Sequence, residues 1–167
     1  GKRTKAEEMI QQTRIEKLYG LIQECRYGIH DLSRTELDDD HKLPRFNMPL
    51  ELGLFLGAKR YGNTAQHDKR LLILDIERFR YQKFISDLAG MDIHEHGGKA
   101  EAAIRETRDW LANVSRRQIP SGDKIVRLYE QFTADLPALA AALEFAPAKI
   151  PYVDFERIVV GWLTRDA

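Results

Sequence analysis

Apolar and polar residues follow two different periods along this chain, one typical of helices and one typical of strands. Apolar residues recur every three or four positions over about residues 5–24 and again over 99–117, which predicts two amphipathic helices. A short run at 27–33 has the length of a strand. The run at 70–75 is almost continuously apolar, as expected for a strand covered on both faces, and residues 91–96 alternate like a short edge strand.

The remaining segments are predicted to be helical. Pro49 suits the first turn of one of these helices, since the N–H that proline lacks has no partner at that position. The segment from Arg78 to Ala89 mixes aromatic and charged residues at helical spacing and stops at Gly90. The other predicted helices cover residues 48–60, 123–133, 135–144 and 152–164.

The order of these elements, helices alternating with strands and then helices alone, predicts an α/β fold with a parallel sheet flanked by helices. We assign residues 1–120 to the α/β core and residues 121–167 to a helical C-terminal extension packed on it. Three strands are few for a sheet buried on both faces, where about five are usual. The chain opens at Gly1 directly into a helix-like segment, so we expect the first strand of the core to be missing.

Composition narrows the class of partner. The 167 residues include 26 Lys plus Arg and 26 Asp plus Glu, so the net charge is zero with neutral histidines and no overall field attracts nucleic acid. Cys25 is the only cysteine, which excludes a disulfide within the chain and suits a reducing compartment. No apolar run approaches the roughly 20 residues that a membrane-spanning helix needs. These features predict a cytoplasmic protein with no membrane partner.

Glu51 is the first candidate for chemistry. It is expected in the first turn of the helix over 48–60, among residues that are otherwise almost all apolar. A carboxylate in a first turn is favoured by the helix dipole, which is one explanation. The other is a partly buried functional carboxylate, able to bind ribose hydroxyls or to attack or stabilise an anomeric carbon as an N-glycosidic bond breaks.

Four polar residues surround this candidate in the sequence. Asp31 and Ser33 end the strand at 27–33, where open α/β folds place groups that bind ligands, although both residue types also form turns and caps. Arg45 and Asn47 precede the Glu51 helix and could contact a phosphate. Asn47 could equally cap that helix, and Arg45 could be an ordinary surface charge.

Two other patterns are weaker. Asp92, His94 and His96 would share one face of a strand, but no second cluster completes a metal site, so no metal is predicted. Cations and aromatics alternate from Arg78 to Phe84, as they do on nucleic-acid surfaces. With zero net charge we interpret that segment as a packed helix with a solvated basic face, which leaves nucleic acid disfavoured as a partner.

Four stretches resemble a group of bacterial proteins with a TIR-like nucleotide-binding fold, related to nucleoside 2-deoxyribosyltransferases and to TIR-domain NAD hydrolases. The stretches are Cys25–Arg34, Pro44–Gly53 and Phe79–Gly90, together with Arg108–Leu111, so the resemblance covers most of residues 14–130. It implies a flavodoxin-like fold. In the deoxyribosyltransferases a Glu-Leu-Gly supplies the nucleophile, which Glu51-Leu52-Gly53 matches, and in the hydrolases the equivalent Glu engages the nicotinamide ribose.

The resemblance implies a nucleotide- or nucleoside-binding domain, with NAD or a nucleoside as substrate or ligand and no other cofactor. Cleavage of an N-glycosidic bond would use Glu51, with Asp31 as its polar partner and Ser33, Arg45 and Asn47 binding the substrate. Both families begin with a strand and loop that contact the nucleotide and that this chain lacks. The alternative is a non-catalytic module that senses a nucleotide or assembles with copies of itself, through apolar positions such as Leu136, Leu139, Leu143 and Phe145.

Overall fold

A parallel sheet of three short strands forms the centre of the computed structural model, which describes residues 13–37 and 42–165. The strands lie in the order β1-β2-β3, with Ile73 of the middle strand opposite His30 on one side and Ile93 on the other. The mixed α/β class and the parallel sheet are therefore confirmed. The strands are β1 (Tyr27–Asp31), β2 (Arg70–Asp75) and β3 (Ile93–Glu95).

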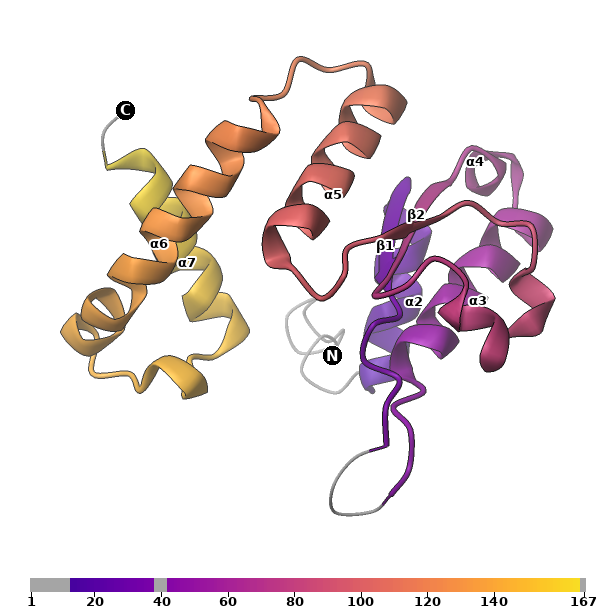
Figure 1. Cartoon of the computed structure of the whole chain (residues 1–167), viewed down its shortest axis with the longest axis horizontal. Coiled ribbons are helices and arrows are strands. Elements are labelled where there is room, and N and C mark those ends of the chain that lie inside the picture. Colours follow the sequence, from indigo (N-terminus) through magenta and orange to yellow (C-terminus); the bar gives the residue numbers. More distant parts are fainter. Residues whose placement is uncertain (1–12, 38–41, 166–167) are drawn as a thin grey trace, which may run out of the picture. The chain divides into compact units, whose positions relative to one another are not determined.

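Helices cover both faces of this sheet (Figure 1). On one face His30 packs edge-on against Phe55 of α3, and on the other Tyr27 packs edge-on against Trp110 of α5. Helix α2 packs against α3. The helices of this part are α2 (Arg14–Glu24), α3 (Asn47–Tyr61), the single turn α4 (Thr64–His67) and α5 (Ala100–Ser115).

The main core lies on the α3 face of the sheet. Its buried members come from β2, from β3, from α3 and from the segments that follow β1 and β2, and half-buried residues such as Met48 and Leu56 of α3 pack around it. Gly28 permits the close approach of α3, because a Cβ there would lie 2.8 Å from the Phe55 ring. The buried cluster is Leu32, Leu52, Ile73, Tyr81 and Ile93.

The helix predicted over residues 78–89 is wrong. The segment instead makes two short 3₁₀ turns, η1 (Arg80–Lys83) and η2 (Ser86–Leu88). Tyr81 is buried in the core, while Arg80 beside it reaches back to Asp75 at the end of β2. These two contacts hold the segment in tight turns against the end of the sheet, so the helix that the spacing of its side chains predicts does not form.

The start of the chain is described only from Thr13. The N-terminal part of the helix predicted over 5–24 lies outside the described residues. Helix α2 begins at Arg14 with a reciprocal cap, in which the Thr13 hydroxyl accepts from the Glu16 N–H and the Glu16 carboxylate accepts from the Thr13 N–H at 2.7 Å. This cap fixes where the first turn of α2 lies.

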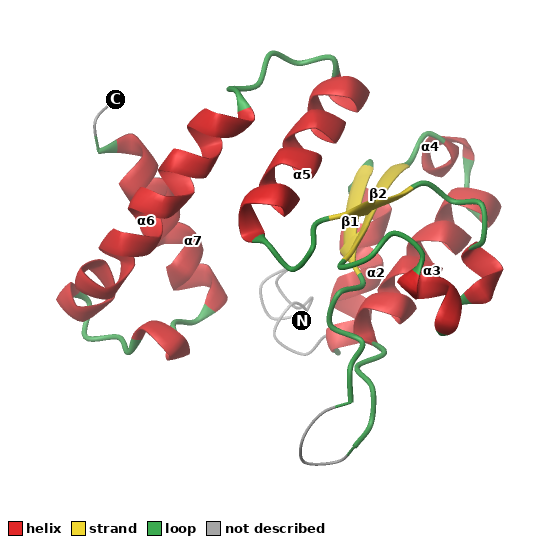
Figure 2. Ribbon diagram, in the orientation of Figure 1, coloured by secondary structure: helices red, strands yellow, loops and turns green. Residues whose placement is uncertain are grey.

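The chain divides into two compact units, one ending at Arg116 and the other starting at Arg117. The second unit contains α6 (Gly122–Ala142), the 3₁₀ turn η3 (Pro147–Lys149) and α7 (Tyr152–Thr164), all drawn as helix in Figure 2. Its core centres on Phe132, whose ring packs edge-on against Phe155 and Trp162. In the described residues, no helix combines the length and apolar character needed to cross a membrane.

Helix α6 is continuous where two separate helices were predicted. Pro137 lies inside it and removes one N–H from the hydrogen-bond ladder. Phe132 before the proline and the buried Ala140 after it both pack within the second unit. This packing holds a single helix through the proline. The bounds predicted for α7 are confirmed.

Candidate functional site

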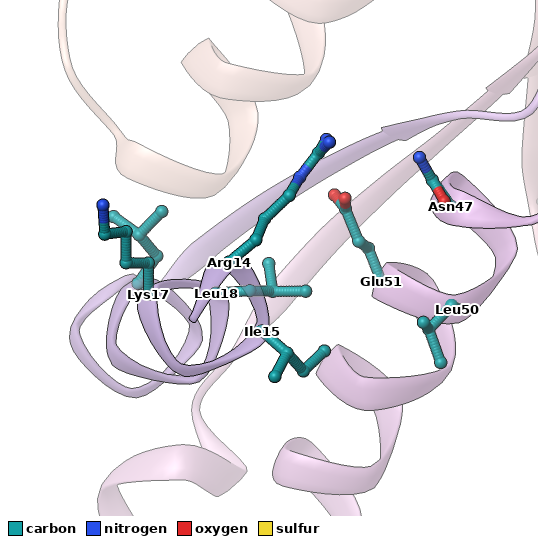
Figure 3. A pocket seen from close by; sticks show the side chains of 8 residues that line it. Arg14, Ile15, Lys17, Leu18, Asn47, Leu50 and Glu51 are labelled. Atoms are coloured by element: carbon teal, nitrogen blue, oxygen red, sulfur yellow. The ribbon is translucent and has the colours of Figure 1, made fainter. Parts of the chain in front are cut away.

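Two hollows in the first unit contain most of the predicted site residues. The first lies between α2 and α3 and is called the α2–α3 hollow; it has a volume of about 400 Å³ (Figure 3). Helix α3 connects the end of β1 to the start of the parallel strand β2, so it runs antiparallel to them and begins towards their carboxyl ends. The residues that line the hollow are Arg14, Ile15, Lys17, Leu18, Leu21, Asn47, Leu50 and Glu51.

The structure corrects the position of Glu51 within its helix. Because α3 begins at Asn47, Glu51 is its fifth residue and lies beyond the first turn, where the effect of the helix dipole falls off. The helix dipole therefore accounts for the position of Glu51 less well than the sequence suggested. Asn47 does not cap the helix either, since Phe46 occupies the N-cap position and makes no side-chain capping bond.

The polar groups of the α2–α3 hollow gather on one side of it. Figure 3 shows the guanidinium of Arg14 and the carboxylate of Glu51 pointing toward one another, with the Asn47 amide beside them. Ile15 and Leu18 supply apolar wall from α2. A carboxylate, an amide and a cation next to an apolar wall are suited to a ligand with hydroxyl groups, an anionic group and a flat apolar part.

The second hollow, called the α5 hollow, has a volume of about 420 Å³ and lies where the three strands end and α5 begins. It contains two of the predicted residues, Asp31 and Ser33, which leave β1 at this edge. Open α/β sheets bind ligands at this edge. The residues that line it are Asp31, Ser33, Arg34, Glu36, Ile76, His96, Gly98, Lys99, Ala100 and Ala103.

A histidine and a carboxylate pair at the base of the α5 hollow. The Gly98 N–H donates to His96 Nδ1 at 3.1 Å, so that nitrogen is an acceptor and the proton of the neutral ring lies on Nε2. Nε2 lies 3.3 Å from Asp31 Oδ1, which also accepts from the Ser33 N–H at 2.9 Å. The His96 side chain is 7% exposed and that of Asp31 is 44% exposed, so a buried donor holds an accessible carboxylate.

Arg80 fixes the loop that follows β1. Its guanidinium donates to Asp75 Oδ1 at 2.6 Å, to the Leu32 carbonyl at 2.6 Å and to the Thr35 hydroxyl at 3.1 Å. Asp75 is completely buried. Residues 32–35, directly after β1, are thereby tied to the end of β2, which sets the position of Asp31 and Ser33.

The predicted site residues are thus brought together in pairs rather than as one group. Glu51 shares a hollow with Asn47, and Asp31 shares a different hollow with Ser33. The two hollows have no lining residue in common. Arg45 is exposed and lines neither of them.

Sequence reasoning missed two residues of these hollows. Arg14 belongs to a helix assigned only by its apolar face, and nothing in its spacing points to Glu51. His96 was considered only as a metal ligand. Its pairing with Asp31 could have been found, because Asp31 ends β1, His96 directly follows β3, and the carboxyl ends of parallel strands meet at one edge of the sheet.

The three residues considered for a metal have other partners. His94 Nδ1 lies 2.5 Å from Glu106 of α5, and its Nε2 lies 3.6 Å from Asp92. His96 is bonded to Asp31 instead. Among the residues that the structure describes, no group of three or more His, Cys, Asp or Glu side chains could hold a metal ion.

Comparison with known proteins adds no family assignment. No protein-family model, no curated protein and no solved structure matches the chain.

Proposed function

We propose that this chain is a nucleotide- or nucleoside-binding domain of the flavodoxin-like, TIR-related type, with Glu51 as its key carboxylate. One observation carries the proposal: Glu51 lies in the α2–α3 hollow, between Arg14 and Asn47. The hollow's volume of about 400 Å³ falls within the range of about 300–1,000 Å³ typical of small-molecule sites. A purely structural carboxylate would be expected in an ion pair or in open solvent, with no hollow beside it.

A nucleoside would contact the apolar wall of the hollow with its base and the polar side with its sugar. The base would lie against the apolar residues Ile15 and Leu18 of α2. The sugar would then present its hydroxyls and its anomeric carbon to Glu51, with the Asn47 amide as a further hydrogen-bonding group. Arg14 supplies a positive charge for a phosphate on the same ligand or for charge on the departing base.

The reaction we propose is cleavage of the N-glycosidic bond. A Glu51 carboxylate oxygen forms a bond to the anomeric carbon, while the bond from that carbon to the base nitrogen breaks and its electron pair leaves with the base. A purine or pyrimidine base takes up a proton from solvent, whereas nicotinamide leaves NAD as a neutral molecule and takes up none. Water then attacks the same carbon and loses a proton to solvent, the ester to Glu51 breaks, and the carboxylate is regenerated as the sugar is released.

A test of this assignment follows the release of base from NAD and from deoxynucleosides incubated with the chain. Replacing the carboxylate in Glu51→Gln should reduce release by about 100-fold or more, because the attacking oxygen is lost. The matched control is Glu101→Gln, an exposed carboxylate in the first turn of α5 that should leave the rate unchanged. Equal release by wild type and Glu51→Gln would overturn the role of Glu51.

A second candidate function is a non-catalytic module that assembles with copies of itself on binding a nucleotide. It is favoured by apolar side chains exposed on α7: Tyr152 is 78% exposed, and Val160 and Leu163 are 55% and 54% exposed. Leu143, one of the positions predicted for such contacts, is also exposed. Mass measured in solution with and without NAD separates the two functions, since assembly on addition of NAD without release of base favours the module.

A further inference from the structure

We infer that the α5 hollow is a second ligand site, separate from the Glu51 site, in which Asp31 held by His96 accepts hydrogen bonds from the hydroxyls of a sugar phosphate. This inference does not depend on catalysis at Glu51, because the two hollows have no lining residue in common. His96 would be a positioning residue that acts on the ligand only through Asp31.

The His96 ring is polar and yet buried. Burying a polar ring costs free energy unless its nitrogens are hydrogen-bonded, and both nitrogens of His96 are. The Gly98 N–H fixes Nδ1 as the acceptor, so the only proton of the neutral ring is directed at Asp31. The buried imidazole therefore serves to orient one carboxylate.

Asp31 retains the capacity to accept further hydrogen bonds. Its hydrogen bonds from His96 and from the Ser33 N–H both fall on Oδ1. An ionised carboxylate can accept about four hydrogen bonds, so Oδ2 is left for donors from a ligand. Hydroxyl groups are such donors, and a carboxylate at the end of a parallel strand is how open α/β sheets bind the 2-hydroxyl of a ribose.

Two cations and a second carboxylate, that of Glu36, line the hollow together with Asp31. Arg34 and Lys99 line the same hollow as Asp31, and the Ser33 side chain adds a hydroxyl. Cations in the same hollow as a hydroxyl acceptor suit a ligand that has an anionic group as well as hydroxyls. A sugar phosphate has both, and the hollow's volume of about 420 Å³ is ample for one.

The competing explanation is that the His96–Asp31 pair only ties the end of β3 to the end of β1. A tie of this kind would be indifferent to the hydroxyl groups of any added molecule. The test therefore measures selectivity between ligands, which a structural role does not change.

The experiment titrates the ¹⁵N-labelled chain with ribose 5-phosphate, with 2-deoxyribose 5-phosphate and with inorganic phosphate. We expect ribose 5-phosphate to shift the amide signals of Ser33, Gly98 and Lys99. It should bind about 10-fold or more tightly than the deoxy sugar, as expected for one hydrogen bond to a charged group. No binding, or equal binding of all three compounds, would overturn the inference.

Two variants at His96 identify its role. His96→Leu removes the donor and should abolish most of the preference for ribose 5-phosphate over the deoxy sugar. His96→Gln, whose amide N–H reaches about as far as Nε2–H, should restore it. Where His96→Leu does not fold, Asp31→Asn serves instead, because that side chain is 44% exposed. A preference that survives Asp31→Asn contradicts the inference.

A last variant assigns the ligand to one hollow. Glu51→Gln should leave the affinity for ribose 5-phosphate unchanged. An affinity that falls in Glu51→Gln places the sugar phosphate in the α2–α3 hollow and overturns the second site. Failure of the base-release assay, by contrast, rejects the reaction at Glu51 and leaves the sugar phosphate result as it stands.

Discussion

The two ends of the sheet differ in how far their polar side chains are buried and in what those side chains bind. At the amino end Lys69, directly before β2, is 1% exposed, and its ammonium donates to the carbonyls of Ile22 and Cys25 at the end of α2. The same ammonium lies 4.8 Å from the centre of the Phe55 ring. At the carboxyl end Asp31 and Glu51 are only partly buried, and each lines a hollow.

This difference separates polar groups that build the fold from polar groups that are available to a ligand. The donors of Lys69 are used within the chain, where they complete the C-terminus of α2. At the opposite end Asp31 keeps an oxygen without a hydrogen bond from the described residues. Asp75, although also at the carboxyl end, is completely buried and belongs with the structural groups.

The largest effect is expected from breaking the Asp75–Arg80 ion pair. Arg80→Met leaves the Asp75 carboxylate buried without its cation, which should lower the free energy of unfolding by about 4 kcal/mol in a urea titration. Lys83→Met in the same 3₁₀ turn is the control, because Lys83 is exposed, and should change it by less than about 0.5 kcal/mol. A loss in Arg80→Met as small as the control's would show that Asp75 is not a structural group.

Acid should destabilise the fold through His30. Burial lowers the pKa of His30 from 6.5 to about 4, and neither ring nitrogen has a hydrogen-bond partner in the part of the chain that the structure describes. Below pH 6.5 the unfolded chain binds a proton that the folded chain does not take up until about pH 4. Stability is therefore lost as the pH falls through this window, by about 3 kcal/mol in total.

Comparison with His30→Leu isolates this contribution. Urea titrations at several pH values should show a smaller acid loss for His30→Leu than for wild type, since the carboxylates titrate in both. His67→Leu, at an exposed position, should follow the wild-type pH dependence. An acid loss in His30→Leu equal to that of wild type would mean that His30 is not held neutral in the core.

Lys69→Met should have an intermediate effect. It leaves two carbonyl oxygens, those of Ile22 and Cys25, without their donor, and each such loss costs about 1–3 kcal/mol. Removing the ammonium also relieves its burial, which lowers the pKa of Lys69, so part of that cost is offset. We expect a net loss of about 2 kcal/mol by urea titration. A gain in stability would show that the burial cost of the ammonium exceeds the value of its bonds.

A second lysine at the amino end tests whether the loss of stability follows the number of bonded carbonyls. The Lys59 ammonium donates to a single carbonyl, that of Lys69. Lys59→Met should therefore cost less than Lys69→Met, about 1 kcal/mol. Equal losses in the two variants would indicate that packing of the lysine chains, rather than the number of bonded carbonyls, stabilises the amino end.

Local patterns in the sequence predicted the elements that have a regular run of apolar residues. The bounds of β2 and α7 follow from continuous and periodic apolar residues, and the helix of Glu51 was placed to within a residue at each end. The segment after β2 was not, because Arg80 and Tyr81 take their conformation from partners distant in sequence. The sequence placed these residues around one ligand, with Asp31 as the polar partner of Glu51, whereas the structure puts the pair Glu51 and Asn47 in one hollow and the pair Asp31 and Ser33 in another. Which of these pairs share a ligand depends on how helices pack around the strands, and the sequence does not contain that directly.

The smallest effect on stability is expected from the carboxylates that line the hollows. Glu51→Gln and Asp31→Asn keep the size of each side chain and remove its charge. The amide oxygen introduced by Asp31→Asn can still accept from the Ser33 N–H and from His96. The hydrogen bonds among the described residues leave Glu51 out, so each variant should change the free energy of unfolding by less than about 0.5 kcal/mol.

The small changes in stability expected for Glu51→Gln and Asp31→Asn test the difference between the two ends of the sheet more directly than the large losses expected for the other variants. Groups that build a fold reduce its stability when they are removed, whereas groups kept for a ligand lower binding or turnover and leave stability intact. Urea titrations of Glu51→Gln and Asp31→Asn, made beside the base-release and sugar phosphate measurements, give both quantities for the same protein samples. A loss of about 2 kcal/mol or more in either variant, comparable with that of Lys69→Met, would place its carboxylate among the structural groups. Unchanged stability together with lost binding would identify the carboxyl end of the sheet as the part of this chain that binds its ligands.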